Sequence, residues 1–132
     1  MSEPWQCTRG ACLLVPSGPG DKHHLFTIAL GPQVLPDRGC CGQVVLVSFT
    51  SIKPDFPHDP ACVVRAGEHS FIVQDSYIYY REPRIEPASH VQSMVDKGVW
   101  RPMAQCGQAL IDRIVAGFQE SKRVPRHVRA LF

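Results

Sequence analysis

Prolines and glycines divide this sequence into short apolar segments, and that division limits what the chain can fold into. There are 12 prolines and 10 glycines in 132 residues. Both interrupt regular structure, proline because it has no amide proton and glycine because its backbone is so free. The segments between them, such as residues 43–51, are rich in β-branched and aromatic side chains, which is typical of strands. The sequence therefore predicts a mainly β domain.

Five segments are predicted to be strands, and they are separated by loops or turns. Residues 25–30 are apolar on both alternating faces, so their strand should lie in the middle of a sheet. The even spacing of the short segments favours a small β-barrel. The predicted strands cover residues 9–15, 22–30, 43–51, 61–65 and 76–81, with 84–86 as an extension of the last one.

The C-terminal part has helical periodicity instead. Residues 89–97 form a short predicted helix, with Ser89 as its N-cap and Gly98 at its C-terminal end. Pro102 is a favourable first residue for a second helix that reaches Phe118. Its apolar residues recur every three or four positions, which predicts one packed face. The fold class is therefore mainly β with a C-terminal α region.

Length and charge indicate one domain, residues 1–120, followed by a basic tail at 121–132. The formal net charge is +2, and the tail carries four basic residues and no acid, so the rest of the chain is close to neutral. Such a tail could contact phosphates, but we expect a solvated end. No apolar run approaches the roughly 20 residues of a membrane helix, and residues 1–6 lack an apolar signal-peptide region. We expect a soluble, cytoplasmic protein.

Six cysteines are present, at positions 7, 12, 40, 41, 62 and 106. They contain no CxxC pair, which argues against a zinc ribbon or a thioredoxin-type site. Reduced thiols in core or loop positions are the main expectation. A metal site made by Cys7, Cys12, Cys40 and Cys41 is the minor alternative. We expect no metal and no cofactor.

The order of the motifs resembles a known family. The chain has Arg9-Gly10 at its first predicted strand and Lys22-His23-His24 at the entrance to its second. Residues 44–53 read Val-Val-Leu-Val-Ser-Phe-Thr-Ser-Ile-Lys. Residues 67–76 end in Asp-Ser, and a strand with Arg-Ile near its end follows at 77–86. From Arg9 to about residue 118, this arrangement resembles the MazF/PemK toxin endoribonucleases.

The resemblance implies a small SH3-like β-barrel packed with one or two helices, usually as a homodimer that cleaves single-stranded RNA. It also implies a toxin-antitoxin system, in which a cognate antitoxin protein occupies the RNA groove. The family's catalytic arginine corresponds to His23, and His24 stands where the family has proline. The family's catalytic threonine or serine corresponds to Thr50, with Ser51 beside it. The change from arginine to histidine departs from the family's usual mechanism.

The residues can be judged by their chemistry as well. Cleavage of RNA through its 2′-hydroxyl needs a base, an acid and positive charge on the phosphate oxygens. An imidazole such as that of His23 can act as acid or base close to neutral pH. Lys22 could supply charge, and Thr50 could donate a hydrogen bond to phosphate. The predicted catalytic residues are His23, Thr50 and Lys22. Equally open is the simpler interpretation of His23 and His24 as polar residues where a loop meets a strand.

Other candidates are less specific. His24, Ser51, Lys53 and His58 are predicted to contact substrate, although His58 could equally belong to a solvated proline-rich loop. His69 is expected at the surface or bonded to backbone. Tyr77 and Tyr79 share one strand face and Tyr80 points to the other, so one face should be core and the other could stack on bases. The alternative function is a non-catalytic SH3-like barrel that binds protein or nucleic acid.

Overall fold

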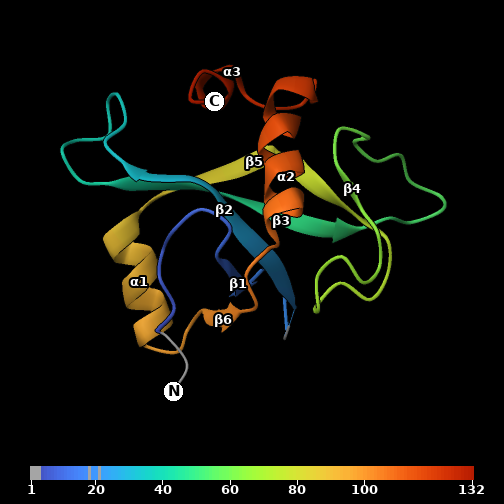
Figure 1. Ribbon diagram of the computed structural model, residues 1–132, viewed down its shortest axis with the longest axis horizontal. Coiled ribbons are helices and arrows are strands. Elements are labelled where there is room, and N and C mark those ends of the chain that lie inside the picture. The colour runs from blue at the N-terminus through green and yellow to red at the C-terminus, as the bar shows by residue number, and fades with distance from the viewer. Residues whose placement is uncertain (1–3, 18, 21) are drawn as a thin grey trace.

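The computed structural model describes residues 4–17, 19–20 and 22–132. Within that part of the chain, six strands form one antiparallel sheet that curls into half a barrel, and three helices pack around it (Figure 1). The strands are β1 (Cys12–Pro16), β2 (His23–Gln33), β3 (Gln43–Ser51), β4 (Val63–Val64), β5 (Ser76–Pro87) and β6 (Arg101–Met103). The helices are α1 (Ala88–Asp96), α2 (Gln108–Glu120) and α3 (Arg126–Arg129).

The strand order is β4-β5-β3-β2-β1-β6, so β2 and β3 are central. This confirms the prediction from the two apolar faces of β2, in which Leu25 and Ile28 are both buried. Gly31 lies at the far end of that strand with φ of 105°. A Cβ there would be placed almost on the carbonyl oxygen of Gln43, so the close pairing of β2 with β3 requires glycine at this point.

Residues 76–87 form a single strand even though Pro83 lies inside it. The register with β3 shifts between the pairs Ser48–Tyr79 and Leu46–Arg84. Pro83 falls within that irregularity, where its missing amide proton interrupts no regular pair of the ladder. The predicted extension at 84–86 is therefore continuous with the predicted strand at 76–81.

Both faces of the curled sheet are covered, and each face has its own apolar cluster. One cluster lies under α2 and α3 and contains Tyr80, Ile114 and Phe118. The other lies under α1 and the N-terminal segment and contains Phe26 and Trp100. Figure 1 shows α2 crossing one side of the sheet while α1 lies apart from it near the N-terminus. These two clusters leave the ends of the central strands as the open part of the sheet.

The C-terminal half differs from expectation at three points. Pro102 lies in β6 rather than at a helix start, and α2 begins at Gln108 after Gly107 as N-cap. A short edge strand satisfies Pro102 equally well, because that position needs no amide donor. Helix α1 begins one residue earlier than predicted, after Pro87, so Ser89 is not its cap.

The basic tail is not simply a solvated end. Val124 and Val128 are buried, and the ring of Phe132 stacks on that of Phe118 at 3.9 Å between centroids. The tail therefore completes the core under α2, while its basic side chains Lys122 and Arg126 stay exposed. None of the helices in the described part of the chain is long and apolar enough to cross a membrane.

Candidate functional site

Two neighbouring hollows open at one end of the central strands, and they share Thr50, Ser51 and Lys53. The first has a volume of about 670 Å³ and is called here the histidine hollow. The second has a volume of about 430 Å³ and is called the tyrosine hollow. The histidine hollow adds Lys22, His23, His24, Phe71 and Val73 to the shared residues. The tyrosine hollow adds Phe56, His58, Tyr77, Tyr79, Arg81 and Arg123.

The strand register explains why residues so distant in sequence meet here. Thr50 is the last residue but one of β3 and pairs with Tyr77 of β5 on one side. On the other side Phe26 of β2 pairs with Ser48. This register, continued by two residues, sets His24 opposite Thr50, so the start of β2 meets the end of β3. His23 is the first residue of β2, and Lys22 directly precedes it. Both residues are exposed.

Hydrogen bonding distinguishes the two adjacent histidines. The hydroxyl of Ser17 bonds Nδ1 of the half-buried His24 ring, which ties β1's end to the start of β2. That bond orients the His24 ring from the side of the loop. His23 is the more exposed of the pair. The exposed apolar side chains Phe71 and Val73 also line this hollow, from the loop that connects β4 to β5.

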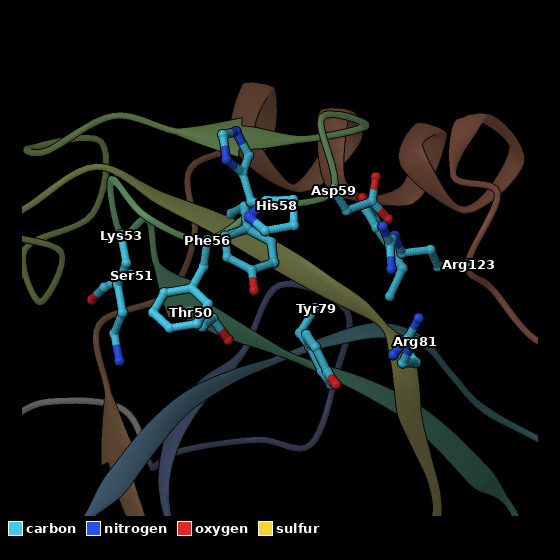
Figure 2. A pocket seen from close by; sticks show the side chains of 12 residues that line it. Thr50, Ser51, Lys53, Phe56, His58, Asp59, Tyr79, Arg81 and Arg123 are labelled. Atoms are coloured by element: carbon cyan, nitrogen blue, oxygen red, sulfur yellow. The ribbon is translucent and has the colours of Figure 1, made fainter.

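The tyrosine hollow is made by the outward face of β5 and by the proline-rich loop after β3. Tyr77 and Tyr79 lie on the same face of the strand, with their ring centroids 6.5 Å apart. His58 from the loop lies 5.5 Å from Tyr77, again between centroids. Phe56 is 67% exposed at the rim. Figure 2 shows the rings of Phe56, His58 and Tyr79 between Lys53 on one side and the pair Arg81 and Arg123 on the other.

The charge lining both hollows is strongly positive. Among the described residues that line the histidine hollow there is no carboxylate, and the tyrosine hollow has only that of Asp59. Asp59 is buried, and both of its oxygens are occupied within the protein. Its Oδ1 accepts from the amide of Ala61 at 3.0 Å, and its Oδ2 accepts from the hydroxyl of Ser121 at 2.5 Å. Uncompensated cations in a hollow attract anions.

All seven residues predicted for the site line one hollow or the other. Six of them, Lys22, His23, His24, Thr50, Ser51 and Lys53, line the histidine hollow. His58 lines the tyrosine hollow together with the three shared residues. Lys22, His23 and Thr50 therefore line the same hollow, as a shared site requires. A fold that held these side chains far apart would have argued against such a site.

Sequence reasoning missed several residues of the tyrosine hollow. Arg81 follows the alternation of Tyr77 and Tyr79 along β5, so a period of two could have identified it. Arg123 had no comparable signal, because it reaches the hollow only through the turn that follows α2. Phe56 stood in a loop that gave no reason to expect an exposed ring.

His69 is a structural residue. It is buried, its Nδ1 accepts a hydrogen bond from the amide of Phe71 at 3.0 Å, and its Nε2 donates to the carbonyl of Ala104 at 2.5 Å. These partners assign the neutral ring with its proton on Nε2. The expectation of a backbone-bonded role is confirmed, while a surface position is wrong.

The cysteines lie in core and loop positions, as expected. Four are buried, and Cys40 and Cys41 lie in the exposed loop after β2. The Sγ atoms of Cys12 and Cys106 are 3.4 Å apart. The hydrogen bond with Cys106, followed by burial, raises the pKa of Cys12, while the same hydrogen bond lowers that of Cys106. No group of three or more histidine, cysteine or acidic side chains within the described ranges could hold a metal ion, so the four-cysteine alternative does not assemble.

Comparisons with known proteins identify no relative of this chain. No family model matches the chain, and neither a curated protein nor a solved structure matches it.

Proposed function

We propose that this chain is an endoribonuclease that cleaves single-stranded RNA without a metal ion, like the MazF/PemK toxins that its motifs resemble. The observation that carries the proposal is that Lys22, His23 and Thr50 line one hollow. The curled sheet with α2 across it is the framework that an SH3-like barrel of that family would need. The same resemblance supports a homodimer in the cytoplasm and a cognate antitoxin protein that blocks the groove.

The reaction that suits these residues is transesterification within RNA. The 2′-oxygen attacks the adjacent phosphorus, and the bond from phosphorus to the 5′-oxygen breaks. The products are a 2′,3′-cyclic phosphate and a free 5′-hydroxyl. His23 serves as the proton-transfer group, since imidazole can both accept and donate a proton near neutral pH. Lys22 stabilises the charge on the phosphate oxygens, and the hydroxyl of Thr50 donates a hydrogen bond to one of them.

The substrate-binding residues extend the same hollow. Ser51 and Lys53 lie beside Thr50 in both hollows, and His24 is held in orientation by Ser17. A phosphodiester carries one negative charge per nucleotide. The described residues that line the histidine hollow include lysines and no carboxylate, which favours RNA over an apolar ligand. A non-catalytic barrel that binds nucleic acid would use the same charges and differs only in lacking turnover.

The test is a cleavage assay on mixed single-stranded RNA in the presence of EDTA. Wild-type protein should cleave, and His23→Ala should slow cleavage by about 10²–10⁴-fold. The matched control is His127→Ala, which removes an exposed imidazole on α3 outside both hollows. If folded wild type and His23→Ala both leave RNA intact, the chain is a binding module instead. A monomeric mass at micromolar concentration would contradict the homodimer.

A further inference from the structure

The tyrosine hollow has aromatic rings and arginines that the proposed cleavage chemistry does not use. Phe56, His58, Tyr77 and Tyr79 line it. Figure 2 shows Phe56, His58 and Tyr79 between cations on two sides. A single exposed aromatic ring is ordinary on a protein surface. Several rings gathered around one hollow of about 430 Å³, within the range of ligand sites, are not explained by packing alone.

The arginines at one end of this hollow remain available to a ligand. None of the ion pairs formed among the described residues includes Arg81, Arg123 or Lys53. By contrast, Arg113 is neutralised by an ion pair with Glu68. Paired guanidinium groups recognise phosphate well, because each presents a planar set of donors.

The hollow is also held in shape by a buried carboxylate. Asp59 accepts hydrogen bonds from the Ala61 amide and from the Ser121 hydroxyl. The same hydroxyl accepts from the amide of Arg123 at 3.1 Å. Asp59 therefore joins the loop that carries His58 to the turn that carries Arg123. Aromatic and cationic walls from distant parts of the sequence are fixed to one another before any ligand binds.

We infer that the tyrosine hollow is a nucleotide-binding subsite, in which one base of a single strand stacks on Tyr79 and its neighbouring rings and an adjoining phosphate binds Arg81 and Arg123. Stacking suits any base, because every base has a flat π-face. Thr50, Ser51 and Lys53 border both hollows, so the strand continues from this subsite into the histidine hollow. This last point rests on the proposed function, whereas binding of the nucleotide does not.

The experiment measures binding of a fluorescent single-stranded hexadeoxynucleotide to the full chain by anisotropy. DNA lacks the 2′-hydroxyl and cannot be cleaved by the proposed route, so binding is read separately from catalysis. Tyr79→Ala should weaken binding by about 5- to 150-fold, the range that corresponds to losing one stacked base. Tyr79→Phe keeps the ring and should restore most of the affinity.

The arginine is tested against a matched charge change in the same segment. Arg123→Gln should lower the slope of log Kd against log salt by about 0.7, as expected for one lost phosphate contact. Arg126→Gln removes the same charge from an exposed position on α3 that lines neither hollow, and should leave the slope nearly unchanged. Equal effects of the two changes would mean that only overall charge matters, and would overturn the subsite.

A base-deletion series makes the test specific. Replacing single bases of the hexamer by abasic sites should weaken binding to wild type most at one position, and that penalty should disappear in Tyr79→Ala. Wild-type affinity of Tyr79→Ala would overturn the inference. So would failure of the hexamer to bind while an acidic peptide does, because the hollow would then dock protein. If hexamer binding depends on Tyr79 but RNA is never cleaved, the subsite stands and the ribonuclease proposal fails.

Discussion

Successive tyrosines on β5 lie in two different environments. Tyr79 faces the hollow with its ring half-buried, whereas Tyr80 is fully buried on the opposite face. The Tyr80 hydroxyl donates to the carbonyl of Ile114 at 2.7 Å, and its ring meets Phe118 edge-on at 4.9 Å between centroids. Burial raises the pKa of Tyr80. Strand alternation alone separates a residue of the core from a residue of the candidate site.

The same division applies to other residue types. Buried His69 has both ring nitrogens bonded to backbone, whereas His23 is exposed at a strand end in a hollow. Arg113 is paired with Glu68, whereas Arg123 lies in a hollow whose one described carboxylate is already bonded. Tyr80, His69 and Arg113 support the fold through these contacts, whereas the exposed side chains that line the hollows can contact a ligand. Four predictions test this division, beginning with the largest expected effect.

Tyr80→Ala should lower the free energy of unfolding by about 3–5 kcal/mol, the usual cost of removing a buried aromatic ring. Tyr79→Ala, on the other face of the same strand, should lower it by less than about 1 kcal/mol. Urea unfolding of both variants measures the difference. Similar losses for the two tyrosines would break the division between core face and hollow face.

Gly117→Ala should destabilise the protein by about 1–3 kcal/mol through overpacking. A Cβ there would lie 2.6 Å from Tyr80 Cζ and closer still to its hydroxyl, and the buried ring has no room to move. In the Tyr80→Ala background the same change should become neutral or stabilising by up to about 1 kcal/mol, since alanine favours helix over glycine. A cost that persists in that background would show that another contact is responsible.

His23→Arg sharpens the comparison on the side of the hollow. Because His23 is proposed to transfer a proton, a guanidinium that keeps its proton should not replace it at neutral pH, and cleavage at pH 7 should be slower than in wild type. At high pH an imidazole loses its charge whereas arginine keeps it, so the activity of the variant relative to wild type should be higher at pH 9 than at pH 7, by about tenfold or less, on the general scale of one charge contact. The measurement is a pH-rate profile of both proteins. Parallel profiles would exclude titration at His23.

Arg113→Met should have the smallest effect. The hydrogen bond from Arg113, followed by the one from the Arg65 amide, lowers the pKa of Glu68 below 4.5. A lowered folded-state pKa adds stability above pH 4.5 that is lost as the pH falls through the folded value. Removing Arg113 should therefore flatten the fall in stability below pH 4.5, at a cost under about 1 kcal/mol at pH 7 for this exposed pair. Arg123→Gln should leave that acid limb unchanged.

Local pattern was sufficient for much of the fold. The bounds predicted for the third strand, residues 43–51, agree with β3, and the central place of β2 follows from its two apolar faces. Pattern failed at Pro102, because the first position of a helix and an edge strand both accept proline. It also failed for the tail, which was expected to be solvated because it carries four basic residues and no acid. Val124 and Val128 of this tail are buried.

The sequence by itself determined the strand periodicity and that Tyr77 and Tyr79 share one strand face while Tyr80 lies on the other, because these depend on neighbours within a few positions along the chain. The candidate residues His23 and Thr50 came from the resemblance in the order of motifs along the chain. Only the tertiary structure decided that Arg123 joins Tyr79 in one hollow, since that meeting depends on where α2 ends and on the hydrogen bond between Ser121 and Asp59. Contacts between segments 62 residues apart leave no periodic trace in sequence, because either partner could satisfy its local rules elsewhere.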